Sequence, residues 1–204
     1  MIGIIDYKVG NLLNVSHAVN RLGYECVISD DVDVLGKCDA LILPGVGAFG
    51  ACMENYRKSG LGEFVENWLK EGKYILGICV GMQILFEKSY EMGEYDGLGY
   101  FKGEVVKFEA PLKIPHMGWN ELKINRTDPI MEGINDGDYV YFVHSYHALA
   151  DKDDVIAYTD YGSEVTAIVG RDNLYATQFH PEKSGDIGHK ILGNYLKIAT
   201  GGAK

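Results

Sequence analysis

Three short stretches of this chain are almost wholly apolar and end at turn-forming or polar residues: Ile2–Ile5, Ala40–Leu43 and Tyr74–Ile78. Successive side chains of a strand point to opposite faces, so a strand that is apolar throughout must be buried on both faces. Such strands are typical of parallel sheets, which carry helices on both faces. The pattern therefore favours an α/β fold.

Segments with helical periodicity separate these runs. Residues 11–22 place apolar side chains on one stripe, and residues 61–70 and 82–91 do the same. Residues 25–29 add a further strand. The first half of the chain thus alternates strand and helix, which is the pattern of a parallel α/β sheet.

The second half of the chain has a different pattern. Strands are predicted over residues 122–124, 139–143, 155–159, 166–169 and 174–179, with short turns between several of them. Close spacing indicates antiparallel strands added to the sheet. Residues 186–198 predict a last helix. Because no linker or repeat divides the chain, we expect one domain over residues 1–204, with an open, mostly parallel sheet.

The charge balance narrows the classes of partner. The chain has 29 acidic residues against 19 lysines and arginines, giving a formal net charge of -10. Such a chain repels the phosphates of nucleic acids and anionic membrane surfaces, so we expect neither as a partner. No apolar run approaches the roughly 18 residues that span a bilayer, and the N-terminus does not resemble a signal peptide.

Four cysteines are scattered along the chain: Cys26, Cys38, Cys52 and Cys79. No two of them form a C-x-x-C pair, so zinc-ribbon and thioredoxin-type sites are not expected. Scattered cysteines in a chain of this size indicate reduced thiols and a cytoplasmic location.

The segment Gly77-Ile-Cys79-Val-Gly81 lies between a predicted strand and a helical pattern. This is the layout of a nucleophile elbow, in which flanking glycines allow a sharp turn that exposes the nucleophile at the carboxyl end of a strand. A helix N-terminus there favours the thiolate, and the Val80 N–H points to where an oxyanion would form. A buried structural cysteine in a glycine-rich turn is the alternative.

A cysteine nucleophile needs a base and a group that orients the base. The segment Gln178-Phe-His180-Pro-Glu182 offers both at the end of an apolar strand. In an extended chain His180 and Glu182 project to the same side, so the carboxylate would fix the tautomer of the imidazole. An exposed surface loop is the alternative.

Other segments are less specific. The glycines of Leu43–Gly50 follow a buried strand and allow backbone N–H groups to approach a ligand. His144 and His147 face opposite sides of a strand end, so we expect no shared metal. Trp119 is either a core residue or an exposed anchor for a partner.

Six ordered segments together resemble class I (triad) glutamine amidotransferases. They are Asp6–Leu12, Leu43–Gly50, Gly77–Gln83, Pro115–Asn120, Phe142–Tyr146 and Gln178–Ser184. The resemblance spans nearly the whole chain and implies a flavodoxin-like α/β fold with helices on both faces of the sheet and added antiparallel strands. It is strongest to glutaminase subunits that pass ammonia to a separate cyclase subunit, a (β/α)8 barrel, in histidine biosynthesis.

The resemblance also implies roles for residues, and it implies no cofactor. Cys79 would be the nucleophile, His180 the acid and base, and Glu182 its orienting group. Oxyanion donors would come from the backbone at Val46, Gly47 and Val80. The residues that would hold glutamine are Gly47, Gln83, Glu91, Ser145 and Tyr146, and those at the partner interface are Asn11, Trp119 and Lys183.

Two alternatives share this fold. One is a glutaminase subunit that serves another synthase, such as a paralogue in polysaccharide assembly. The other is a stand-alone γ-glutamyl thiol hydrolase, which would turn over without any partner.

Overall fold

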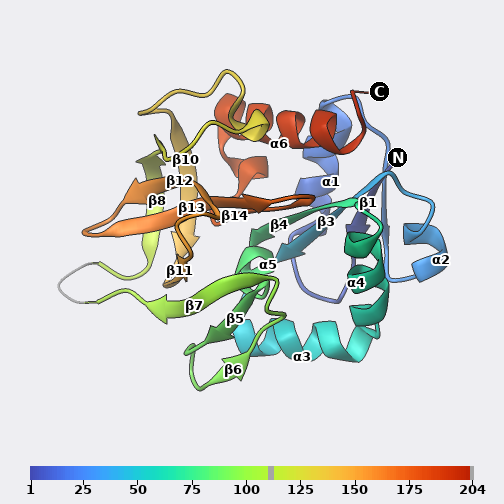
Figure 1. The fold of residues 1–204 in the computed structure, drawn as a ribbon, viewed down its shortest axis with the longest axis horizontal. Helices are drawn as coiled ribbons and strands as arrows, with labels where there is room; N and C mark the ends of the chain where they lie inside the picture. Colours follow the sequence, from blue (N-terminus) through green and yellow to red (C-terminus); the bar gives the residue numbers. More distant parts are fainter. Residues whose placement is uncertain (110–112, 203–204) are drawn as a thin grey trace.

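The computed structural model describes residues 1–109 and 113–202 and is built around an eight-stranded sheet (Figure 1). The strand order is β2-β1-β3-β4-β14-β13-β12-β9. Five strands are parallel: β1 (Ile2–Ile5), β2 (Cys26–Ser29), β3 (Ala40–Gly45), β4 (Tyr74–Cys79) and β14 (Leu174–Thr177). Three strands extend the sheet in antiparallel pairing: β13 (Glu164–Arg171), β12 (Val155–Asp160) and β9 (Lys123–Ile124).

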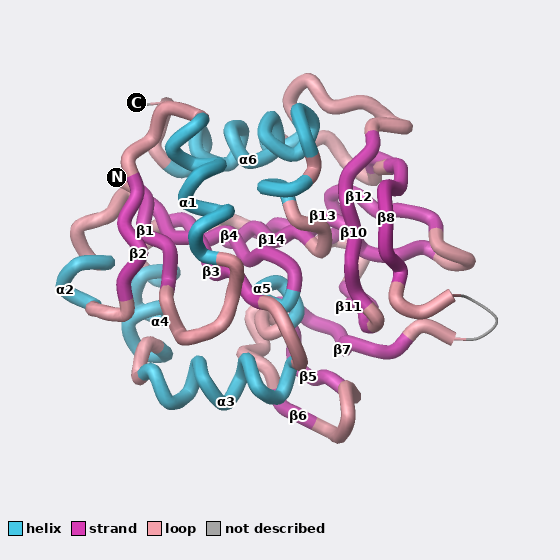
Figure 2. Tube along the Cα trace, turned by 180° about the vertical axis from the view of Figure 1, so that it is seen from behind, coloured by secondary structure: helices cyan, strands magenta, loops and turns pink. Residues whose placement is uncertain are grey.

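Helices cover both faces of the sheet, as Figures 1 and 2 show from opposite sides. One face carries α1 (Leu12–Arg21) and α6 (Gly185–Ala199), and the other carries α3 (Phe49–Ser59) and α4 (Gly62–Lys70). Shorter helices are α2 (Val32–Leu35), α5 (Val80–Gln83), and the 3-10 turns η1 (Pro129–Met131) and η2 (Pro181–Lys183). The mixed α/β fold expected from the sequence is confirmed.

Two smaller sheets flank the main one. A pair joins β10 (Tyr139–His144) to β8 (His116–Glu121), and a four-stranded sheet has the order β11-β7-β5-β6. Its strands are β11 (Tyr146–Ala150), β7 (Phe101–Lys107), β5 (Phe86–Ser89) and β6 (Tyr95–Asp96). Sequence patterns did not identify β5, β6, β7, β8 or β11, nor helix α3.

The apolar runs are buried as their sequence demands. All positions of β1 and β3 are buried, as are all positions of β4 after Tyr74. At about 25 cal/mol per Å² of apolar surface removed from water, these strands make the centre of the core strongly favourable. The core holds the carboxyl ends of β3 and β4 in register, because Gly45 pairs with Cys79.

One predicted helix is wrong. The helix after Cys79 ends at Gln83, and Phe86–Ser89 is strand β5, not the second half of a helix over 82–91. The apolar spacing of Met82, Leu85 and Phe86 fits a helix, but Phe86 pairs with Phe101 of β7. Pairing with a strand that the sequence did not reveal overrides the local pattern.

Within the described residues no helix is both long enough and apolar enough to cross a membrane.

Candidate active site

A cavity of about 360 Å³ lies at the carboxyl ends of β3, β4 and β14. This is the edge where open parallel sheets place ligands, and the size suits a small molecule. Most of the residues that the sequence singled out line it. The lining residues are Val46, Gly47, Cys79, Val80, Gln83, Glu91, Pro115, Val143, His144, Ser145, Tyr146, His180 and Lys183.

The elbow at Cys79 has the geometry that its glycines require. Cys79 has φ 56° and ψ -112°, a conformation that side-chain-bearing residues rarely adopt. A Cβ on Gly81 would lie 1.9 Å from the carbonyl oxygen of Leu43, and one on Gly77 would lie 2.9 Å from that of Gly81. No side chain fits at either position, so the turn depends on both glycines.

The imidazole of His180 is held from behind by a carboxylate. Its Nδ1 lies 2.8 Å from Oε1 of Glu182, and both side chains are almost fully buried. A protonated Nδ1 that donates to Glu182 leaves Nε2 for the cysteine. The sequence argument for this contact was wrong in one respect: the chain from Pro181 is a 3-10 turn, not an extended strand.

The protonation state of His180 follows from its surroundings. Burial alone would lower its pKa, but hydrogen bonds and charge interactions with Cys79 and Glu182 outweigh burial and raise the pKa to about 9. At neutral pH the ring is therefore an imidazolium. An imidazolium beside a cysteine favours the thiolate, so the pair is set up for nucleophilic attack.

The three residues expected to supply oxyanion donors line the cavity together with Cys79. Val80 begins α5, and Val46 and Gly47 follow β3 on the other side of the cavity. Gly47 has φ 93°, which favours glycine. The carbonyl of Val46 accepts a hydrogen bond from the thiol of Cys52, 3.4 Å away in α3. The loop is thus tied to the helix that follows it.

The residues expected to hold glutamine come from four segments but share the cavity. Gln83 lies in α5, Glu91 follows β5, Ser145 links β10 to β11 and Tyr146 begins β11. Glu91 also accepts a hydrogen bond of 2.6 Å from the Phe49 N–H at the start of α3. Both N–H bonds of the Gln83 amide are used inside the protein, so its oxygen is the group left for a ligand.

The three expected interface residues differ in exposure. Trp119 is 55 % exposed, which settles the choice between core and surface for this residue. Met117 and Tyr139, on β8 and its partner strand β10, are 61 % and 53 % exposed. Lys183 is exposed at the rim of the cavity, and Asn11 is half-buried before α1.

Sequence reasoning missed a buried polar cluster beside the cavity. His116 lies on β8 and His144 on β10, and Nδ1 of His116 is 3.0 Å from Nε2 of His144. Burial lowers the pKa of His144 to about 3 and that of His116 to about 4. Both rings are therefore neutral. Across residues 1–109 and 113–202, no group of three or more potential ligands is arranged to hold a metal ion.

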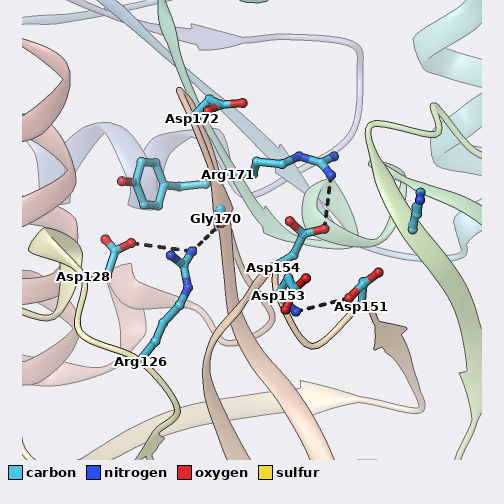
Figure 3. A pocket seen from close by; sticks show the side chains of 10 residues that line it. Arg126, Asp128, Asp151, Asp153, Asp154, Gly170, Arg171 and Asp172 are labelled. Atoms are coloured by element: carbon cyan, nitrogen blue, oxygen red, sulfur yellow. Dashed lines mark hydrogen bonds and ion pairs between the residues drawn. The ribbon is translucent and has the colours of Figure 1, made fainter.

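A second cavity, of about 480 Å³, lies at the other end of β14 (Figure 3). Its charged lining residues are Lys102, Arg126, Asp128, Asp151, Asp153, Asp154, Arg171 and Asp172. Four of these groups form two ion pairs: Arg126 lies 3.6 Å from Asp128, and Arg171 lies 3.5 Å from Asp154. The cavity contains no cysteine or histidine, so we regard the smaller one as the candidate active site.

Comparison with known proteins identifies the family to which the chain is similar. The sequence pattern of the family described as glutamine amidotransferase class-I matches residues 3–198. The chain is 52 % identical to imidazole glycerol phosphate synthase subunit HisH of Lactococcus lactis, over 95 % of this chain and 96 % of that protein. It is 48 % identical to the subunit of the same name from Methanocaldococcus jannaschii, over 97 % of this chain and all of that protein.

Solved structures share the fold at lower sequence identity. A structure of PurLQS from Thermotoga maritima matches with a TM-score of 0.76 and 23 % identity, over 97 % of each chain. A putative GMP synthase subunit from Thermoplasma acidophilum matches with a TM-score of 0.73 and 22 % identity, over 98 % of this chain and 94 % of that one.

Proposed function

The chain belongs to the class-I glutamine amidotransferase family, and we propose that it is the glutaminase subunit of imidazole glycerol phosphate synthase. It hydrolyses glutamine and supplies the ammonia to a second subunit of the synthase. The observation that carries the proposal is the buried contact of His180 with Glu182 opposite a cysteine held at an elbow. Identity near 50 % to HisH subunits over nearly full length supports the specific synthase.

Acylation starts from the thiolate of Cys79 and the imidazolium of His180. The Cys79 thiolate attacks the side-chain amide carbon of glutamine, and the carbonyl oxygen becomes an oxyanion. The N–H groups at Val80 and the Val46–Gly47 loop stabilise that oxyanion. The imidazolium of His180 gives its proton to the departing nitrogen, which leaves as ammonia. Cys79 then carries a γ-glutamyl thioester.

Deacylation reverses the proton flow. Neutral His180 takes a proton from water, and the resulting hydroxide attacks the thioester carbon. Collapse of the second tetrahedral intermediate expels the Cys79 thiolate and releases the γ-carboxylic acid, which loses its proton to water and becomes glutamate, while His180 is an imidazolium again. Glu182 holds the ring in one tautomer throughout and stabilises its charge.

We infer that the second subunit is a cyclase with a (β/α)8 barrel and that it docks over the exposed face of β8 and β10. The apolar side chains of Met117, Trp119 and Tyr139 stand on these two strands, and an exposed Trp is a frequent anchor of protein interfaces. Lys183 is at the cavity rim on the chain segment that follows His180. Docking there would cover the active-site cavity, so that ammonia passes to the partner instead of becoming ammonium in water.

Three further properties belong to the proposal. Residues 1–204 act as one domain, because strands from both halves of the chain share the main sheet. The enzyme uses no cofactor, since the protein side chains supply every proton transfer. It works in the cytoplasm, with all four cysteines reduced.

The test measures glutamate released from glutamine by the purified chain, alone and with a purified cyclase subunit and the nucleotide ligand of that cyclase. We expect strong stimulation by the liganded cyclase and no activity for Cys79→Ala in either condition. High activity that is indifferent to the cyclase would instead indicate a stand-alone hydrolase or a different synthase. Activity retained in Cys79→Ala would overturn the thiol mechanism.

A further inference from the structure

Two buried glutamines lie near the nucleophile, and only one of them, Gln83, has been given a role so far, in binding the substrate. Gln83 is 3 % exposed and Gln178 is fully buried. Gln178 lies between the end of β14 and His180, and its Nε2 is 3.9 Å from Sγ of Cys79. A buried amide is costly unless its donors and acceptor are satisfied, so the direction in which Gln178 points is not arbitrary.

A single backbone carbonyl fixes that direction. The carbonyl of Tyr146 can only accept, and Nε2 of Gln83 donates to it at 3.0 Å. The same Nε2 donates to Oε1 of Gln178, also at 3.0 Å. Reversal of the Gln178 amide would bring two N–H groups face to face. The NH2 group of Gln178 must therefore point to the sulfur of Cys79.

The same carbonyl is held from its other side by the histidine pair. Nδ1 of His144 donates to it at 2.8 Å, so Nε2 of His144 accepts from His116. Nε2 of His116 in turn faces the amide of Asn120 at 3.2 Å. Both lone pairs of the Tyr146 carbonyl are thus occupied by donors. Burial keeps the pKa of both rings near 4 or below, so both histidines stay neutral above pH 6 and the directions of their hydrogen bonds do not change.

The hydrogen bond from Gln178 stabilises the sulfur of Cys79 substantially only when the sulfur is a thiolate. A thiol is a weak acceptor, whereas an anion roughly doubles the strength of a hydrogen bond that it accepts. Helix α5 behind Cys79 has only four residues, so its dipole is small. A hydrogen-bond donor at Gln178, just after β14, therefore adds to the stabilisation that the helix terminus provides.

We propose that Gln178 is a further catalytic residue, which stabilises the Cys79 thiolate by donating an amide hydrogen to its sulfur in an orientation imposed by Gln83 and the Tyr146 carbonyl. The inference rests on the proposed role of Cys79 as nucleophile. It assigns to Gln178 an effect on the charge of the sulfur, separate from the proton transfers of His180.

Other groups also act on this sulfur and stay constant in the test. His180 forms a hydrogen bond with Cys79, and Tyr7 and Cys52 interact with Cys79 electrostatically. Glu91 and Lys183 line the same cavity. None of them is changed in the variants below.

The experiment measures the rate at which iodoacetamide alkylates Cys79 as a function of pH, followed on the Cys79 peptide by mass spectrometry. Two replacements remove the donor: Gln178→Met keeps the length of the side chain, and Gln178→Glu keeps its shape but presents a second acceptor to the sulfur. The matched control is Asn194→Leu, a buried amide in α6 that donates to the carbonyls of Ile130 and Glu132, away from the site.

We expect Gln178→Met to move the alkylation midpoint upward by about half to one pH unit, which lowers the rate on the acid side of the midpoint roughly three- to tenfold. Gln178→Glu moves it further in the same direction, and Asn194→Leu leaves it unchanged. An unchanged midpoint in both Gln178 variants, with folding verified by circular dichroism, would overturn the assignment.

Alkylation needs neither glutamine nor a partner. A wild-type chain that releases no glutamate with any cyclase would refute the proposed function and leave the alkylation result readable. A normal glutaminase whose alkylation midpoint ignores Gln178 would refute only the role of Gln178.

Discussion

The two cavities at opposite ends of β14 differ in a way that their size does not predict. The larger, about 480 Å³, is lined by three basic and five acidic side chains (Figure 3). The smaller, about 360 Å³, contains one cysteine, two histidines and few charges. By volume and charge the first looks more like a binding site, yet the second is lined by Cys79 and His180, the residues that we propose act as nucleophile and as acid and base.

The difference lies in burial and pairing. In the larger cavity Arg126 and Arg171 are 38 % and 45 % exposed, so water screens their contacts with Asp128 and Asp154. In the smaller cavity His180 is 3 % exposed and faces two groups that favour its charged form. Groups that are buried on both sides of a contact shift one another's pKa values more than ion pairs in which one partner is exposed to water.

The largest expected contrast comes from the same chemical change made in each cavity. Glu182→Gln removes the carboxylate behind His180, and we expect glutaminase activity to fall about 10³- to 10⁴-fold because the ring loses its tautomer and charge support. Asp154→Asn should leave that activity unchanged. Steady-state glutamate release from both variants checks this, and comparable losses in the two would break the contrast.

A second contrast compares glycines of the two cavities. Gly81→Ala would place a Cβ against the backbone of Leu43, which cannot move without disrupting β3, so we expect a loss of about 4 kcal/mol in unfolding free energy or failure to fold. Gly170→Ala meets side-chain atoms only, the end of Ile156 and the ring edge of Tyr175. Those can shift, so we expect about 1–2 kcal/mol.

Urea denaturation of both variants measures these losses. Equal losses would mean that the elbow is no more tightly packed than strand β13 at the larger cavity. Gly62→Ala is the common control, because nothing lies within 4 Å of its Cβ position.

The pH dependence of stability and of glutaminase activity should show the ionisation of His180. Its folded-state pKa of about 9 exceeds the ordinary value of 6.5, so protonated His180 stabilises the fold fully below about pH 6.5. That contribution is lost as pH rises through about 9. Activity should fall over the same range, since neutral His180 has no proton for the leaving nitrogen.

Melting temperature and glutaminase rate, both recorded from pH 6 to pH 10, check this expectation. A rate that stays flat through pH 10 would exclude the imidazolium as the acid. In Glu182→Gln the alkaline decline should begin at lower pH.

The smallest effect on stability is expected from the ion pair of Arg171 and Asp154, in which only the arginine is exposed. Arg171→Ala leaves the buried carboxylate of Asp154 without its cation, and burial already raises the pKa of Asp154 despite Arg171. We expect a loss of about 1 kcal/mol in unfolding free energy at pH 7 and no change in glutamate release. Asp154→Asn in the same chain should recover the loss. A change in activity would mean that the two cavities communicate.

Some elements of the fold could be predicted from the sequence and others could not. The elbow could be predicted because its requirement is local: strand, glycine, nucleophile and glycine follow one another within a few residues. Burial of β1, β3 and β4 followed from their apolar runs for the same reason. The strand β5 could not be predicted, since its partner β7 pairs with it only after the chain has folded back.

The same distinction between local and long-range constraints applies to the candidate site. The sequence by itself determined that Cys79 lies at a sharp turn and that His180 and Glu182 are close, because neighbouring residues constrain one another through the backbone. Only the tertiary structure decided that Gln178 points at Cys79, 99 residues away, that His116 meets His144, and that Trp119 is exposed. Contacts of this kind depend on which strands pair and which faces meet, and burial then fixes the hydrogen bonds and charges.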